Sequence, residues 1–286
     1  MEVLTLAAVL ALVSALFSAV GSVAQHGAAT QVSDKDSSGL ALMTGLARQP
    51  VWWAGFLGDA GGYGFQAVAL GLGPLLLVQP LLVASLVFAL PISAYWSGRE
   101  VNRSDLGWAV ALSAALLAFL VIGDPSLGVD HASLREWAVV GCGLLLLTGG
   151  CVLGATFSTG ALRAGLLAVT AGAFYGLTAA LTKSVVDIIA ASPLEALTAP
   201  GTYALVGSGT LGFYFQQAAF QAGSIGASLP AITLVEPVVA AAIGVGILEE
   251  HIRADGPALV MLGLSAVVMV VSTVALSLSS ARAGIT

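Results

Sequence analysis

The chain has 286 residues, of which 58% are hydrophobic and only 8% are charged, and its net charge is -6. Soluble domains carry about 25% charged residues, so this composition excludes a soluble globular protein and predicts a membrane protein. The nine Lys and Arg residues also exclude nucleic acid as a partner, because that binding requires many phosphates to be neutralised.

The first apolar segment, 4–24, predicts a spanning helix rather than a signal peptide. A signal peptide begins with cationic residues and has a shorter apolar core, whereas the only early charge here is Glu2. The polar run 34–39 predicts the first loop, because it cannot lie in lipid. Pro50 then predicts the start of the second helix, where its missing N–H has no consequence.

Further apolar runs near 20 residues continue along the chain, each long enough for a hydrocarbon core of about 30 Å. Prolines and glycines between them, as at Gly123-Asp124-Pro125 and Ser192-Pro193, indicate loops. We therefore predict an all-α polytopic membrane protein with about nine transmembrane helices, with ten as the alternative count. The predicted ranges are 4–27, 51–72, 74–97, 105–122, 135–154, 162–183, 199–222, 225–248 and 257–279.

The chain contains an internal repeat. The pattern Glu-x-x-Arg-x-Asp occurs twice, 150 residues apart, and the same offset pairs Gln66 with Gln216 and Pro80 with Pro230. This predicts a first repeat over 1–155, with about five helices, and a second over 156–286, with about four. If five helices, an odd number, precede the second copy, its helices cross the membrane in the direction opposite to those of the first. Such inverted repeats place a binding site near the bilayer midplane. The two copies of the pattern are Glu100, Arg103, Asp105 and Glu250, Arg253, Asp255.

The repeated unit resembles the drug/metabolite transporter superfamily, and its EamA-type members in particular. The resemblance spans about residues 4–279 and includes Ser97-Gly98-Arg99-Glu100 and Ile247-Leu248-Glu249-Glu250. It implies two five-helix halves and transport of small solutes. Two other stretches resemble the NIPA-type magnesium transporter branch: Pro50-Val51-Trp52-Trp53-Ala54-Gly55 and Pro74-Leu75-Leu76-Leu77-Val78-Gln79-Pro80-Leu81.

The chain departs from that branch in the second helix. The branch has an acidic residue close to an Asn there, and the corresponding positions are Tyr63 and Gln66. The nearest acid, Asp59, lies one turn earlier. This departure favours an organic solute over a metal ion.

The charge distribution gives an orientation. Alternate loops lie on the same side of the membrane. Six of the nine Lys and Arg lie in the predicted loops of one side, and three lie in those of the other: Arg135, Lys183 and Arg253. The positive-inside rule then favours an outside N-terminus and a cytoplasmic C-terminus. We expect a multi-pass protein of the cell (inner) membrane.

Two carboxylates, Asp59 and Glu236, fall deep inside predicted helices. An acid at the centre of a spanning helix costs roughly 2.5–3.5 kcal/mol on insertion scales, so both are functional candidates. Either could bind and release a proton during transport; a neutral, hydrogen-bonded carboxyl that fixes packing is the structural alternative. Pro237 removes a backbone donor next to Glu236, which could expose a carbonyl to a cation or hydrate, or could simply kink the helix.

Polar stripes flank these acids. Asp59, Tyr63 and Gln66 share one helix face. We predict that they line one central polar cavity together with Tyr214, Gln217 and Gln221 of the seventh helix and Glu236 of the eighth. A stripe that serves only as hydrogen-bonding glue between helices is the alternative. The seventh-helix stripe is Thr210, Tyr214, Gln217 and Gln221, and a weaker stripe on the sixth helix is Tyr175, Thr178 and Thr182.

The repeated charged motif has a structural interpretation. Asp105 and Asp255 stand where a helix N-cap belongs, and Glu and Arg three residues apart can pair on a short turn. Lys183 and Asp187, four residues apart, are predicted as another interfacial pair.

No motif indicates an enzyme, a cofactor or a metal site. The nucleotide loop Gly-x-x-x-x-Gly-Lys-Ser/Thr is absent, no nucleophile–base group stands out, and Cys142 and Cys151 fall on opposite helix faces. The leading function is secondary transport of a small organic metabolite or drug by alternating access, with proton coupling through Glu236 or Asp59. The alternatives are a Mg²⁺ or other divalent-cation transporter and a non-transporting membrane scaffold or assembly partner. The expected partners are a small-molecule substrate and the lipid bilayer, and the chain could form a homodimer.

Overall fold

The structure is a computed structural model that describes residues 2–29, 47–97, 101–128, 132–222 and 225–283. The described residues form a bundle of helices and contain no β-strand beyond one isolated bridge. The helices are α1 Glu2–Ala29, α3 Pro50–Leu72, α4 Leu75–Leu82, α5 Ser85–Ser97, α6 Arg103–Gly123, α7 Leu134–Thr156, α8 Gly160–Ala191, α9 Pro193–Ala196, α10 Pro200–Ala222, α11 Ile225–Ile247 and α12 Pro257–Ala283.

Within the described residues, seven helical segments are long and apolar enough to cross a membrane, and one of them, Leu75–Trp96, consists of α4 and α5 together. The protein is therefore an integral multi-pass membrane protein, as the composition predicts. Each of the predicted helical ranges contains a helix. Two long helices, α3 and α10, are not among the seven although each has 23 residues; both contain several glycines and polar side chains, which lower their hydropathy.

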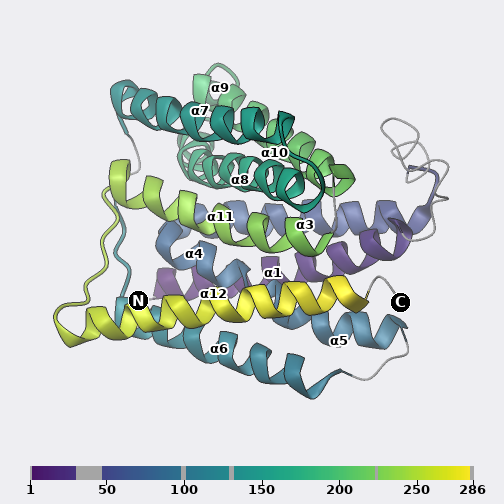
Figure 1. The fold of residues 1–286 in the computed structure, drawn as a ribbon. Helices are drawn as coiled ribbons and strands as arrows, with labels where there is room; N and C mark the ends of the chain where they lie inside the picture. Colours follow the sequence, from purple (N-terminus) through teal and green to yellow (C-terminus); the bar gives the residue numbers. More distant parts are fainter. Residues whose placement is uncertain (1, 30–46, 98–100, 129–131, 223–224, 284–286) are drawn as a thin grey trace.

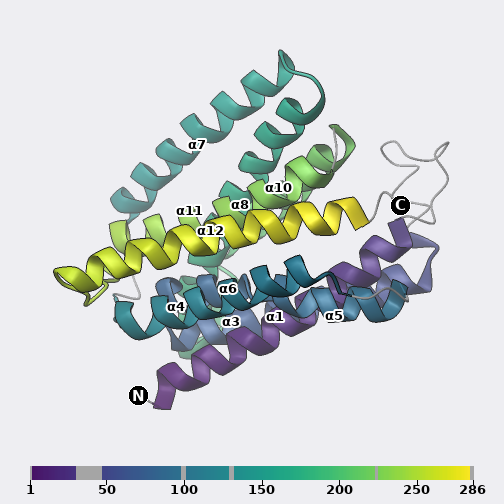
Figure 2. The same ribbon diagram turned by 60° about the horizontal axis from the view of Figure 1, so that its bottom comes forward.

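The helices pack around α8, which contacts α10, α11, α3 and α7. A second group is formed by α1 on α3, with α4 and α5 against α1, and a third by α6 on α12. Figure 1 shows α8 and α10 side by side on one flank and α6 with α12 on the other, with α11 between them. In Figure 2, α7 leans away from the bundle, in keeping with its contacts, which are mainly to α8.

Small residues bring α8 and α11 into backbone contact. A Cβ atom at Gly176 would lie 2.7 Å from the carbonyl oxygen of Glu236, and one at Gly172 would lie 2.9 Å from the Cβ of Val235. Glycines four residues apart are the spacing that lets two membrane helices approach closely. The approach fixes α8 directly against the middle of α11, where Glu236 and Pro237 lie.

Two predicted helices differ from the structure. The range 74–97 is broken into α4 and α5, because the backbone tightens to i→i+3 hydrogen bonds after Pro80, from Val83 N to Pro80 O at 3.1 Å and from Ala84 N to Leu81 O at 3.0 Å. The helix predicted over 162–183 runs on to Ala191. Lys183 therefore lies inside α8, which removes it from the loop charges used for the orientation.

The structure also corrects the N-cap of α6. This helix begins at Arg103, and its N-cap is Asn102, whose Oδ1 accepts from the N–H of Ser104 at 3.3 Å. Asp105 lies in the first turn instead, where a negative charge still suits the helix dipole. The helix α12 begins at Pro257, two residues after Asp255. Glu100 lies outside the described residues.

Candidate functional site

Four polar side chains follow one another along α8, and each reaches another part of the chain. We call them the α8 polar tract: Tyr175, Thr178, Thr182 and Lys183. The Tyr175 hydroxyl donates to Oε1 of Gln216 on α10, and the Thr178 hydroxyl bonds that of Ser208, also on α10, at 2.9 Å. The Thr182 hydroxyl bonds that of Tyr63 on α3 at 2.7 Å.

The face of α10 that meets this tract is not the predicted Thr210–Tyr214 stripe. Ser208, Gly212 and Gln216 recur every four residues and face α8; a Cβ at Gly212 would lie 2.8 Å from the ring of Tyr175. Tyr214 lies on another face, is 63% exposed, and makes an edge contact with the ring of Phe215. The side chains of Gln217 and Gln221 lie outside the described part of the chain.

Glu236 occupies the middle of α11, and its backbone lies against α8 at Gly176. Its side chain is half-buried. Within the described residues, no hydrogen bond to its carboxylate is recorded. Pro237 follows inside the helix and removes one backbone donor there.

Asp59 lies on α3 and faces α1. A Cβ at Gly21 would lie 2.3 Å from Oδ1 of Asp59, so the carboxylate fills the space that this glycine leaves. Asp59 and Gln66 are both half-buried. Asp59 lies one turn from Tyr63 on α3, and Glu236 lies on α11, so the two acids belong to two different helices that both contact α8.

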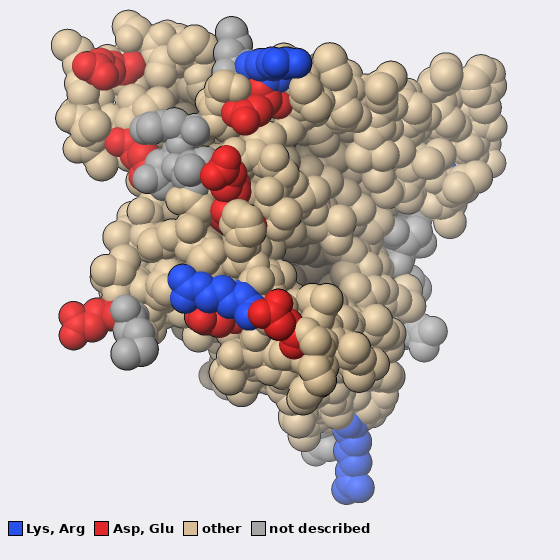
Figure 3. Space-filling model, turned by 90° about the vertical axis from the view of Figure 1, so that its left-hand side faces the viewer, with Lys and Arg blue, Asp and Glu red and all other residues tan. Residues whose placement is uncertain are grey.

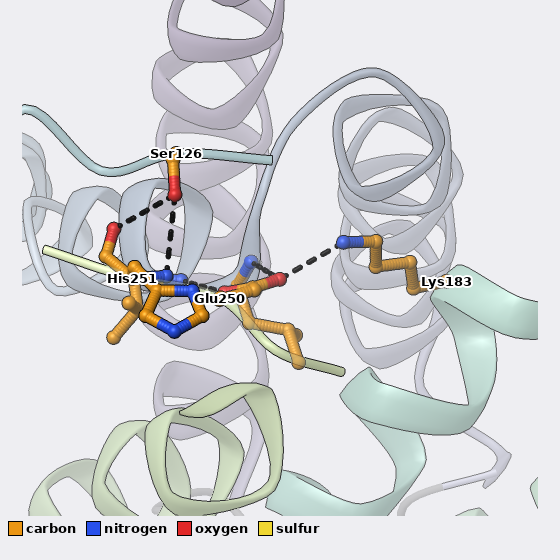
Figure 4. Close-up of polar contacts among 6 residues, drawn as sticks. Ser126, Lys183, Glu250 and His251 are labelled. Carbon is orange, nitrogen blue, oxygen red and sulfur yellow. Dashed lines mark hydrogen bonds and ion pairs between the residues drawn. The ribbon is translucent and has the colours of Figure 1, made fainter. Parts of the chain in front are cut away.

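The fourth member of the tract, Lys183, forms a buried ion pair. Its Nζ lies 2.9 Å from Oε1 of Glu250, and the two side chains are 3% and 0% exposed. The same carboxylate accepts from the first two N–H groups of α4, those of Leu75 at 2.7 Å and Leu76 at 3.0 Å. Figure 4 shows Glu250 facing Lys183, while the adjacent His251 meets Ser126.

This ion pair was not predicted from the sequence. The sequence pattern predicts instead that Glu250 pairs with Arg253 and that Lys183 pairs with Asp187. In the structure Arg253 pairs with Asp124 at 3.3 Å, and both side chains are exposed. One feature of the sequence indicates a buried ion pair. Lys183 is a lone cation surrounded by apolar residues, in a range long enough to remain helical.

Charges of both signs gather at this end of the bundle. Figure 3 looks onto it and shows acidic and basic side chains among an otherwise uncharged surface. Within the described residues, no three His, Cys, Asp or Glu side chains lie together in a group that could hold a metal ion.

Comparison with known proteins identifies a relative but no activity. Neither a known family model nor a solved structure matches the chain. An uncharacterized protein of Corynebacterium glutamicum is 36% identical over 276 residues, which cover 96% of each chain. The chain belongs to the same family as this protein.

Proposed function

We propose that the protein is a secondary active transporter of a small organic metabolite, of the drug/metabolite transporter type, in which Glu236 exchanges a proton during each cycle. The proposed transporter has nine spanning helices in two inverted repeats and alternates its access between them. The observation that carries the proposal is a carboxylate in the middle of an apolar helix, beside a proline, with no hydrogen bond recorded in the described part.

The helix boundaries support the duplication. The helix α3 covers 50–72 and α10 covers 200–222, while α4 and α5 together cover 75–97 and α11 covers 225–247. Each pair differs by the 150 residues that separate the charged motifs. The same offset therefore relates helices as well as residues.

The packing supports a twofold relation between the halves. The pair α1 and α3 corresponds to the pair α8 and α10, and both pairs are in extensive contact. The helix α6 packs on its counterpart α12, and α4 on its counterpart α11. A pseudo-twofold axis between two repeats brings equivalent helices together in this way.

The proposed mechanism uses the α8 polar tract as the substrate-facing surface. Its hydroxyl groups, with Tyr63 and Gln216, offer donors and acceptors to an organic solute. Asp59 and Glu236 supply negative charge on either side. A charge inside the membrane carries a large free-energy penalty, and protonation of Glu236 removes that charge. A conformation that buries Glu236 more deeply would therefore bind the proton more tightly than one that exposes it to water.

A reconstitution experiment tests the proposal. Purified protein is placed in liposomes that contain the pH indicator pyranine, and separate pools of amino acids, nucleosides, sugars and organic amines, or Mg²⁺ alone, are added. We expect one organic pool to change the internal pH in liposomes that carry the protein, and Glu236→Gln to abolish this change. The matched control is Glu195→Gln, which alters an exposed glutamate of α9.

Each other result points elsewhere. A response to Mg²⁺ alone would favour the divalent-cation transporter. Uptake of an organic pool that is unaffected by Glu236→Gln would assign the coupling to Asp59 or show uncoupled transport. Protein-dependent flux of none of the pools, measured by mass spectrometry of the liposome contents, would favour a scaffold.

A further inference from the structure

The ion pair between Lys183 and Glu250 joins parts of the chain that are distant in sequence. Lys183 lies on α8 and Glu250 follows α11, both in the second repeat, whereas the N–H groups of Leu75 and Leu76 belong to α4 in the first. The hydrogen bonds therefore span 67 and 175 residues. Glu250 connects the two repeats at one end of the bundle.

The carboxylate lies well inside the protein. Lys183 is eight residues from Ala191, the last residue of α8, which corresponds to about 12 Å along the helix. Glu250 is completely buried. A Cβ at Gly244 would lie 2.9 Å from Oε2 of Glu250, so α11 leaves room for the carboxylate on its own last turn.

The backbone after α11 adopts an uncommon conformation that directs the side chain of Glu250 into the protein. Glu249 has a positive φ of 52°, in the left-handed region that non-glycine residues rarely adopt. The N–H of Glu250 bonds the carbonyl of Gly244 at 2.9 Å. The turn after α11 is therefore shaped around the insertion of one side chain.

A second contact lies beside it. Pro125, after α6, and Ile252 form an antiparallel β-bridge, and the N–H of Ser126 donates to His251 O at 2.9 Å. A Cβ at Gly128 would lie 1.8 Å from the carbonyl oxygen of Leu248. The segments 123–128 and 248–253 thus close together over the same end of the bundle.

We infer that Glu250, held by Lys183 and the N-terminus of α4, is the closed gate at this end of the bundle and withdraws when the transporter opens there. The inference rests on the proposed transport function. Fixed packing could be achieved with apolar residues, since replacing a buried ion pair by hydrophobic side chains is often neutral or stabilising. The two charges of an ion pair can be hydrated by water when they separate in an open state. An ion pair therefore suits a contact that must form and break.

Thiol labelling tests the gate without any need for a known substrate. Thr178, one turn from Thr182 towards the middle of α8, is replaced by Cys in a background with Cys142→Ser and Cys151→Ser. A membrane-impermeant methanethiosulfonate is then applied to either side of reconstituted vesicles. We expect Glu250→Gln and Lys183→Met each to raise the labelling rate of the cysteine at position 178 about tenfold, because a minor open conformation gains population. The increase should come from one side of the membrane only, and that side should be the same for both variants.

The matched control is Arg253→Gln, which breaks the exposed pair with Asp124 in the adjacent segment and is expected to leave labelling unchanged. An unchanged rate in both gate variants, or an equal rise from both sides, would overturn the inference. Size-exclusion profiles and thermal melting separate a local opening from general unfolding, which raises labelling from both sides.

A covalent staple gives an independent result in case the gate variants do not fold. Opposed residues of an antiparallel bridge have Cα atoms about 4.5–5.5 Å apart, within the range for a disulfide. Pro125→Cys with Ile252→Cys, in the same cysteine-free background, should stop transport of the pool identified above when oxidised and restore it on reduction. Transport that continues with the disulfide formed would overturn the gate but leave the transport function intact, whereas absence of flux in every reduced protein would contradict the transport function itself.

Discussion

Glu236 and Glu250 stand 14 residues apart in the sequence, and the structure gives them opposite environments. Glu250 is completely buried, and its carboxylate binds Lys183 and two backbone N–H groups. Glu236 is half-buried, and the described residues record no hydrogen bond to its carboxylate. A carboxylate held by several buried partners is costly to leave unpaired, while one with few partners loses little when its surroundings change. The comparison separates a carboxylate that joins α8 to α4 from the one on which the proposed proton exchange depends.

The largest expected loss of unfolding free energy comes from breaking the buried pair of Lys183 and Glu250. Lys183→Met leaves Glu250 without its cation, and removing one partner of a buried pair destabilises by about 3–5 kcal/mol. The double variant Lys183→Met/Glu250→Gln should recover part of that loss, because the unpaired charge is gone. The measurement is unfolding of the detergent-purified protein in SDS, followed by circular dichroism.

Arg253→Met is the control for this prediction. Arg253 and Asp124 are 65% and 60% exposed, and exposed pairs contribute about 0–1 kcal/mol. Equal losses from Lys183→Met and Arg253→Met would show that Glu250 does not depend on its buried partner.

An intermediate effect is expected where α8 meets Glu236. Gly176→Ala would put a Cβ 2.7 Å from the Glu236 carbonyl oxygen, so we expect a loss of about 1–3 kcal/mol from overpacking. Gly165→Ala on the same helix meets nothing within 4 Å and should stabilise by up to about 1 kcal/mol through helix propensity. The same unfolding assay compares the two, and a result in which both variants behave alike would rule out close helix contact at Gly176.

The smallest expected effect on stability is that of Glu236→Gln. The amide keeps the shape of the side chain and disrupts no hydrogen bond recorded in the described residues, so we expect a change within about 1 kcal/mol. Glu250→Gln should be clearly less stable than Glu236→Gln in parallel unfolding experiments. If the order were reversed, Glu236 would have a structural role and the contrast between the two glutamates would fail.

Much of the fold could be predicted from the sequence. Each spanning helix is encoded by its own apolar run, and its ends by local prolines, glycines and charges, so the helical ranges agree to within a few residues for most of the chain. The break after Pro80 and the extension of α8 to Ala191 were missed because continuous apolar composition hides a break and one lysine was taken as an end.

The candidate site was less accessible to prediction. The sequence indicated Asp59, Tyr63 and Glu236 as polar residues in apolar helices, and it also indicated the α8 hydroxyl groups. It did not indicate Ser208 and Gln216 as the α10 residues that bond α8, because several faces of that helix carry polar residues and only packing selects among them. The assignment of a common cavity stays a prediction for all of its residues: Asp59, Tyr63, Gln66, Tyr214, Gln217, Gln221 and Glu236.

The sequence by itself determined that this is a polytopic helical membrane protein with a duplicated pattern, because hydropathy and repeat spacing are properties of short segments and fixed offsets. Only the tertiary structure decided the partner of each charge. Glu250 lies three residues from Arg253 but binds Lys183 and the start of α4, 67 and 175 residues away. Such pairs depend on how each helix is rotated and how closely its neighbours approach, and both follow from packing of the whole bundle rather than from any one segment.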